Sequence, residues 1–178
     1  MARKSSLREF QQSLALRLRD AASRKTVLSR LGFQVGEEKW LVNLSDVSEV
    51  IPVPNIVPVP LTLPWYRGVA NIRGKLYSIA DFATFQEQPA IGIGMERRVI
   101  LVAEKLIEGS GFVVSRMLGL HNPEQFTPES SDTFVAKPWI KGAYRDAGGT
   151  RWYELDLSGL TRDARFLEVG VVTAAVAT

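Results

Sequence analysis

The sequence predicts an all-β domain preceded by one helix and interrupted by short helical turns. From Val27 onward, short segments rich in Val, Ile, Tyr, Phe and Trp alternate with Gly, Pro and Asn at intervals of about ten residues. A second observation is an internal repeat within this β pattern. The third is composition: of 178 residues, 46% are hydrophobic and 23% charged, which is typical of one globular domain.

The β pattern divides into four antiparallel strand pairs. In each pair, two short apolar segments flank a turn that contains Gly or acidic residues. The expected pairs are residues 31–35 with 40–43, 69–73 with 76–80, 97–102 with 111–114, and 140–144 with 151–155.

Two aspartates follow predicted strands and precede short helical patterns. Asp81 precedes residues 82–85, and Asp156 precedes residues 157–160. A carboxylate at such a position accepts hydrogen bonds from the free N–H groups of the first helical turn. We therefore expect both residues to be helix caps. The competing interpretation, a catalytic carboxylate pair, is disfavoured because symmetry-related units hold the two groups far apart.

Two segments are expected to be surface connections. Residues 52–64 contain five prolines, and each proline removes a donor from a β ladder. Because Val and Ile interleave these prolines, we expect an ordered loop packed on its own domain rather than a proline-rich ligand. Residues 122–132 are predicted to form a second exposed loop.

The repeat sets the expected architecture. Pro64-Trp65-Tyr66-Arg67-Gly68 returns 74 residues later as Pro138-Trp139-Ile140-Lys141-Gly142, and each copy is followed by a strand pair and then by a capping Asp. Two related β units of about 70 residues, sharing a core across a pseudo-two-fold axis, explain this pattern.

The N-terminal segment, residues 1–26, is predicted to be a basic amphipathic helix. Ser6 and Glu9 fit a capping box, and an apolar stripe follows at helical spacing, comprising Leu7, Phe10, Leu14, Leu18 and Ala21. The stripe can pack on the chain's own body or on a partner, and periodicity alone does not separate these alternatives. The β domain is placed at residues 27–172, followed by a tail at 173–178.

The charge is unevenly distributed. Residues 1–30 hold eight Lys or Arg and two acidic residues, a net +6, whereas the remainder holds fourteen basic and seventeen acidic residues, a net −3. The sequence pI of 9.3 therefore belongs to the N-terminal segment. A mildly acidic body argues against a nucleic-acid backbone as its ligand.

Composition excludes several enzyme classes. The chain has no Cys and a single His, His121, which removes cysteine nucleophiles, redox pairs and multi-histidine metal sites. No phosphate-binding glycine loop occurs. No apolar segment approaches the ~20 residues needed to span a bilayer, and the N-terminus lacks a secretory pattern. We expect a cytoplasmic protein without catalytic residues, metal or cofactor.

Candidate binding residues remain. Arg73 ends a predicted strand just before Gly74, where its guanidinium can form a structural salt bridge or contact a partner; both interpretations are open. Val47 and Val50 flank Glu49 and could form an apolar and acidic patch. Large aromatic residues are enriched at interfaces but are more often core residues in a small β domain; those in question are Trp65, Tyr66, Trp139, Trp152 and Tyr153.

Three short motifs resemble the CheW-like adaptor family of bacterial chemosensory arrays. They are Phe33-Gln34-Val35-Gly36, Val47-Ser48-Glu49-Val50, and Gly68-Val69-Ala70-Asn71-Ile72-Arg73-Gly74 with Asp81 following. The resemblance covers residues 27–162. It implies two intertwined five-stranded β-barrel subdomains around a common hydrophobic core.

The resemblance also implies a function. Members are non-enzymatic adaptors between the cytoplasmic tip of a methyl-accepting chemoreceptor and the regulatory domain of a CheA-type histidine kinase. One face of the first subdomain contacts the kinase, and the groove between subdomains takes the receptor tip. The residues expected on or near partner-contacting surface are Val47, Glu49, Val50, Gly68, Asn71 and Arg73. No nucleic acid, direct membrane insertion, metal or cofactor is expected.

Two positions depart from the family pattern, and the ends of the chain suggest a subgroup. Ser78 stands where the family has Pro, and Val114-Ser115 replaces Val-Asp. The basic N-terminal helix and divergent second half are similar to adaptors of type IV pilus systems, which control twitching motility. The alternative hypothesis is a small β-barrel nucleic-acid-binding protein that uses the basic helix as an electrostatic arm.

Overall fold

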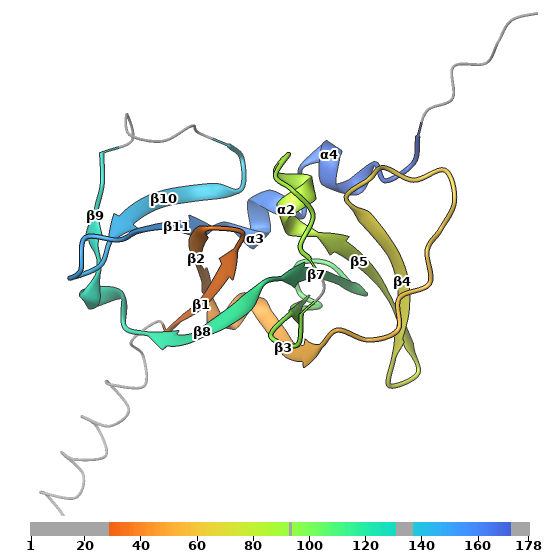
Figure 1. The fold of residues 1–178 in the computed structure, drawn as a ribbon, viewed down its shortest axis with the longest axis horizontal. Coiled ribbons are helices and arrows are strands. Elements are labelled where there is room, and N and C mark those ends of the chain that lie inside the picture. Colours follow the sequence, from red (N-terminus) through yellow and green to blue (C-terminus); the bar gives the residue numbers. More distant parts are fainter. Residues whose placement is uncertain (1–28, 93, 131–136, 172–178) are drawn as a thin grey trace, which may run out of the picture.

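Two sheets placed side by side form the body of the molecule (Figure 1). The structure, a computed structural model, describes residues 29–92, 94–130 and 137–171. The predicted N-terminal helix at 1–26 and the tail at 173–178 lie outside these ranges.

Each sheet is built from strands of both halves of the chain. The first sheet has the order β8 (Arg116–His121), β1 (Arg30–Val35), β2 (Glu38–Asn43), β11 (Arg151–Leu155), β10 (Ile140–Arg145) and β9 (Thr127–Pro128). The second sheet has the order β3 (Val47–Pro52), β6 (Arg98–Val102), β7 (Ser110–Val114), β5 (Lys75–Asp81) and β4 (Tyr66–Ile72). The short helices are η1 (Leu44–Asp46), α2 (Phe82–Phe85), η2 (Pro123–Gln125), α3 (Leu157–Leu160) and α4 (Ala164–Leu167).

The four predicted strand pairs are confirmed as antiparallel pairs: β1 with β2, β4 with β5, β6 with β7, and β10 with β11. The five strands β8-β1-β2-β11-β10 of the first sheet repeat the order β3-β6-β7-β5-β4 of the second. Each set contains one parallel pair, β2 with β11 and β5 with β7. This repetition confirms an all-β fold of two pseudo-symmetric five-stranded units.

The units are intertwined because the chain crosses between the sheets after β2 and again after β7. β3 follows β2 in the chain but pairs with β6 of the second sheet. β8 follows β7 but pairs with β1 of the first sheet. Neither half of the sequence therefore completes a sheet alone.

The repeated Trp and Asp residues have the same backbone role in both units. The N–H of Asp81 donates to the Trp65 carbonyl at 2.7 Å, and the N–H of Asp156 donates to the Trp139 carbonyl at 2.8 Å. Both predicted helix caps are confirmed. The Asp81 carboxylate accepts from the first-turn N–H groups of α2, and that of Asp156 accepts from Gly159 in α3.

One aromatic core joins the two units. Phe33 of β1 lies 6.0 Å from Phe112 of β7, measured between ring centroids. Phe85 contacts both repeated tryptophans, Trp65 at 5.3 Å and Trp139 at 4.8 Å. The core interpretation of the tryptophans is confirmed, since Trp65, Trp139 and Trp152 are buried; Tyr66 and Tyr153 are partly buried against the same core.

The proline-rich segment is ordered and packed on its own domain, as expected. Val57 exchanges two backbone hydrogen bonds with Val69 of β4, at 2.8 and 2.9 Å. Farther along, the N–H of Leu63 donates to the Val169 carbonyl at 2.8 Å. The second predicted loop is more structured than expected, because η2 and the short strand β9 lie within it and β9 pairs with β10.

The two repeated glycines are under different constraints. Gly68 has φ +124°, and a Cβ placed on it would lie 2.0 Å from the Val57 carbonyl oxygen. Gly142 carries no such restriction: its nearest neighbour would be the Tyr144 ring at 3.4 Å. The close approach of the proline-rich segment therefore explains the requirement for glycine at position 68 only.

We expect Gly68→Ala to lower the free energy of unfolding by about 3 kcal/mol or more, because left-handed strain adds to steric overlap with backbone atoms. Gly142→Ala is the matched control at the same motif position, with an expected loss within about 1 kcal/mol. Urea unfolding of both variants measures the difference. Equal losses would contradict the assigned cause.

The first sheet buries a carboxylate where the second buries an apolar side chain. Glu154 and Ile79 occupy equivalent positions, paired with Gly142 and Gly68 respectively. The Glu154 carboxylate lies 2.9 Å from Arg30 Nη2 and 3.4 Å from Lys141 Nζ, and accepts the Tyr144 hydroxyl at 2.7 Å. These partners compensate for burying its charge.

Burial, reinforced by the hydrogen bond to Glu154, raises the pKa of Tyr144 from 10.0 to about 12. The folded protein therefore holds this proton at pH values where the unfolded chain releases it. Its contribution to stability is complete below about pH 10 and is lost as pH rises towards 12.

Thermal unfolding midpoints measured between pH 9 and 12 test this assignment. We expect the midpoint of the unmodified protein to fall more steeply above pH 10 than that of Tyr144→Phe, which has no proton to lose at this position. Tyr66→Phe, whose hydroxyl bonds Ser78 instead, keeps the steep decrease because Tyr144 is still present. Identical profiles for all three proteins would refute the assignment.

Candidate functional site

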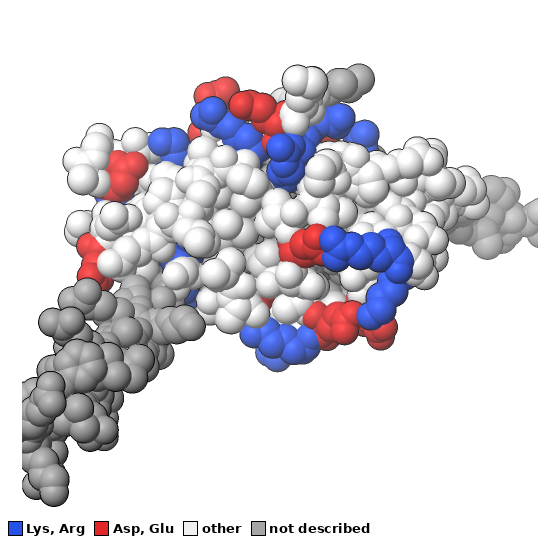
Figure 2. All heavy atoms as spheres, turned by 90° about the horizontal axis from the view of Figure 1, so that it is seen from below, with Lys and Arg blue, Asp and Glu red and all other residues white. Residues whose placement is uncertain are grey.

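The predicted partner-contacting residues gather around β3 and the turn between β4 and β5. We name this surface the hairpin face, defined by Val47, Glu49, Val50, Asn71 and Arg73. It lies on the lower side of the molecule in Figure 1, where β3 and the β4–β5 turn are found. Viewed from below, basic and acidic groups adjoin one another on an otherwise largely uncharged surface (Figure 2).

A two-pronged ion pair dominates the hairpin face. Arg73 Nη1 donates to Glu49 Oε2 at 2.8 Å, and Nη2 donates to Oε1 at 2.7 Å. The sequence predicted that Arg73 could fork onto a carboxylate but did not identify Glu49, which is 24 residues away. Since β3 and β4 are opposite edges of the second sheet, the pair links one edge strand to the turn that follows the other.

Arg73 adopts a conformation that its residue type disfavours. Arg73 and Gly74 form a two-residue turn with φ +53° and +85°, the pattern of a type I′ turn. The side chain of Asn71 stabilises the turn by accepting the Gly74 N–H at 2.9 Å. A left-handed conformation costs a non-glycine residue about 1–2 kcal/mol.

The ion pair stabilises the fold by no more than this conformation costs. The side chain of Arg73 is 76% exposed and that of Glu49 is 34% exposed, and exposed pairs contribute only about 0–1 kcal/mol. Arg73 therefore brings little net stability to the fold. Its guanidinium is preorganised and accessible to a partner.

The remaining predicted residues contribute in other ways. Val47 and Val50 pack partly against the core, so each offers only part of its side chain to the surface. A bulge between Val47 and Glu49 interrupts the pairing of β3 with β6. Gly68 is buried beneath Val57, so it shapes the domain under the hairpin face rather than lying on it.

Two further ion pairs border this surface and were not identified from the sequence. Lys75 Nζ lies 2.6 Å from Glu104 Oε1, and Lys105 Nζ lies 2.8 Å from Asp46 Oδ1. The hydrogen bond to Glu104, and then its charge, raise the pKa of Lys75. The sequence shows a polar stretch between β6 and β7 that contains Glu104 and Lys105. It does not show their partners, because the pairing depends on tertiary contact.

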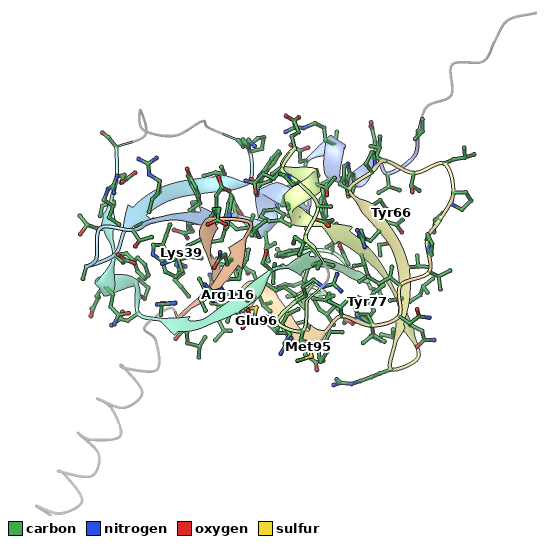
Figure 3. All side chains as sticks on the ribbon, in the orientation of Figure 1. Lys39, Tyr66, Tyr77, Met95, Glu96 and Arg116 are labelled. Carbon is green, nitrogen blue, oxygen red and sulfur yellow. The ribbon has the colours of Figure 1, made fainter. Side chains whose placement is uncertain are left out.

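The two departures from the family pattern have local explanations. The Ser78 N–H donates to the Gly109 carbonyl at 2.7 Å, a bond that proline could not make. The Ser115 hydroxyl accepts the Gly36 N–H at 3.1 Å. Figure 3 shows Tyr66, whose hydroxyl bonds Ser78 at 3.1 Å, on the side of the second sheet.

In the described part of the chain, the acidic residues and His121 do not form a metal-binding cluster. Within residues 29–92, 94–130 and 137–171, no group of three His, Asp or Glu side chains is arranged to hold a metal ion. His121 lies against Phe126 and Trp152, and its Nε2 is 3.2 Å from the Leu118 carbonyl oxygen. None of the helices in these ranges is both long and apolar enough to cross a membrane.

Comparison with known proteins supports the interpretation of this architecture. The chain is 30% identical over 146 residues to Protein PilI of Pseudomonas aeruginosa, covering 80% of each protein. It is 29% identical over 106 residues to chemotaxis protein CheW of Thermotoga maritima, covering 58% of this chain and 65% of that one.

A solved structure shares the fold. The scaffolding protein TtCheW from Thermoanaerobacter tengcongensis superimposes with a TM-score of 0.68 at 18% identity, covering 81% of this chain and 98% of that one. A family model described as the CheW-like domain matches residues 30–165, from the first residue of β1 into α4. Because this match includes every strand of both sheets, the chain belongs to the CheW-like family.

Proposed function

We propose that the protein is a non-enzymatic adaptor that couples a methyl-accepting chemoreceptor to a CheA-type histidine kinase. The observation that carries this proposal is the family match across both intertwined sheets. The hairpin face is the surface proposed to contact the kinase, and the groove between the two units is proposed for the receptor tip. The protein would act in the cytoplasm, at arrays of membrane-bound receptors.

The hairpin face has the physical character of a binding surface. Its central guanidinium is exposed, held in one orientation by Glu49 and by a rigid two-residue turn. Partly exposed Val47 and Val50 lie on β3, the strand that carries Glu49. Arginine beside apolar residues is a frequent composition for protein interfaces, and preorganisation lowers the entropy cost of association.

The proposed mechanism is geometric. An adaptor with two separate faces holds receptor and kinase in a fixed relative orientation. A change in receptor conformation then alters kinase activity through contacts that differ between the two receptor states. No bond is made or broken by the adaptor.

Assignment to a type IV pilus system that controls twitching motility is part of the proposal. Similarity to Protein PilI extends over 80% of this chain, whereas similarity to the Thermotoga CheW extends over 58%. The broader match supports the pilus branch over the flagellar one. The nucleic-acid alternative receives no support from the hairpin face, where Arg73, Lys75 and Lys105 are each paired with a carboxylate.

Calorimetric titration with the regulatory domain of the CheA-type kinase from the same organism tests the adaptor function. We expect saturable one-to-one binding that persists at raised salt. Arg73→Asn should weaken it about tenfold or more, equivalent to about 1.4 kcal/mol, by removing the guanidinium. Asn tolerates the left-handed position better than Arg, so the thermal midpoint should be unchanged or slightly higher.

The control is Arg145→Asn, which removes an exposed arginine from the other sheet and should leave the affinity unchanged. Equal weakening by both variants would refute a specific role for the hairpin face. Complete absence of kinase binding by the unmodified protein would refute the adaptor proposal itself. Salt-sensitive binding to DNA or RNA would favour the nucleic-acid alternative.

A further inference from the structure

A second surface, distant from the hairpin face, combines an apolar floor with a charged rim. It is a pocket of about 380 Å³ between α2, α4 and the end of the proline-rich segment. Leu63, Trp65 and Phe85 form its floor, and Glu87, Arg165 and Glu168 lie at its rim. In Figure 1, α2 and α4 lie on the upper side of the molecule, whereas β3 lies on the lower side. We name this surface the rim pocket.

The floor of the rim pocket is rigid and aromatic. Trp65 meets Phe85 edge to face at 5.3 Å and stacks on Phe166 at 5.7 Å, measured between ring centroids. Such rings accept both apolar side chains and cations on their faces. One such cation–π contact is present beside the pocket, where the Arg165 guanidinium lies over the Trp139 ring at 4.8 Å from its centroid.

The rim carries uncompensated negative charge. Arg165 is paired with Asp163, at 3.5 Å. Glu87 and Glu168 are both exposed, and among the described residues neither carboxylate has an ion pair or a side-chain hydrogen bond. Two free carboxylates beside an aromatic floor complement a segment that carries basic and apolar residues together.

Glu87 occupies a backbone position where glycine is preferred. The N–H of Gln88 donates to the Ala83 carbonyl and that of Glu87 to the Thr84 carbonyl, which is the Schellman pattern at a helix C-terminus. Glu87 has φ +65° at the left-handed position of this motif. Replacing Glu87 by Gly therefore removes the carboxylate without disturbing the turn.

We propose that the rim pocket binds the chain's own N-terminal basic segment, residues 1–28. This segment contains seven Lys or Arg and two acidic residues, together with Leu7, Phe10, Leu14 and Leu18. Basic residues meet the free carboxylates, and apolar residues meet the floor. The segment is the occupant favoured by the observations because covalent attachment gives it an effective concentration that a separate partner lacks.

The contact is predominantly electrostatic at the rim of the pocket, so it weakens with ionic strength.

The basic segment is long enough to reach the rim pocket. An extended chain advances about 3.3 Å per residue and a helix about 1.5 Å per residue. Twenty-eight residues therefore span about 40 Å even if fully helical, comparable with the diameter of roughly 40 Å expected for a domain of this length. The same chemistry permits binding within one molecule or between two copies.

Paramagnetic relaxation enhancement on the full chain tests the proposal. The sequence contains no Cys, so Ser13→Cys provides a unique site for a nitroxide label within the basic segment. At low salt we expect broadening of the backbone amide signals of Thr84, Glu87 and Gly170, and its loss at high salt. To separate binding between copies from binding within one molecule, nitroxide-labelled protein without isotopes is mixed with isotopically enriched protein that carries no nitroxide. Broadening in this mixture reports binding between copies.

Two sets of variants keep the test independent of folding. Glu87→Gly combined with Glu168→Gln should abolish the broadening, while the left-handed strain relieved at position 87 leaves the thermal midpoint equal or higher. Glu37→Gln combined with Glu96→Gln removes two exposed carboxylates elsewhere and should preserve the broadening. Absence of broadening in the unmodified background, or its persistence after both rim carboxylates are removed, would overturn the proposal.

Discussion

The pairing of β3 and β8 with strands from the other half of the chain is the constraint on which the rest of the structure depends. Each is an edge strand, and each pairs with the first strand of a hairpin from the other half of the chain, β3 with β6 and β8 with β1. Because a sheet that lacks one of these strands would expose unpaired backbone groups and core side chains, the halves must fold together. The ring contact between Phe33 and Phe112 joins the two sheets in the core, so core packing also requires both halves of the chain.

Pseudo-symmetry fixes the strand order but leaves the two units free to differ in chemistry. An ion pair between Glu49 and Arg73 links the edge strand of the second sheet to its hairpin turn. In the first sheet, the corresponding edge strand is held through ring contact between His121 and Trp152 at 4.9 Å. The first unit buries Glu154 where the second buries Ile79. Because of this difference, the second unit presents the accessible, preorganised guanidinium of Arg73.

Strained backbone marks the surfaces proposed for binding. Among the described residues, non-glycine residues with positive φ are Leu61, Arg73 and Glu87. Arg73 and Glu87 occupy turn positions where Asn or Gly would be more stable, and both carry exposed charges at the two proposed binding surfaces. The fold gains nothing evident from either choice, whereas a binding surface gains a charge fixed in position on a rigid turn.

Local pattern determined much of this structure. Alternating apolar residues and turn-forming residues were sufficient for the four hairpins, and the spacing of Asp81 and Asp156 behind the repeated Trp-Gly motif identified both caps. These features depend on hydrogen bonds and side-chain periodicity within a few residues. The repeat also indicated two related units, because equivalent sequence segments adopt equivalent structure.

Tertiary structure decided what depends on distant contacts. No hairpin rule predicts that β3 and β8 cross to the opposite sheet, since each pairs with a strand far from its chain neighbours. The partner of Arg73 follows from that crossing, because it brings Glu49 to the β4–β5 turn. Gly68 was expected at a contact surface, but Val57 covers it. The sequence by itself determined the strands, caps and repeat, whereas packing between the units decided which charges meet and which remain exposed.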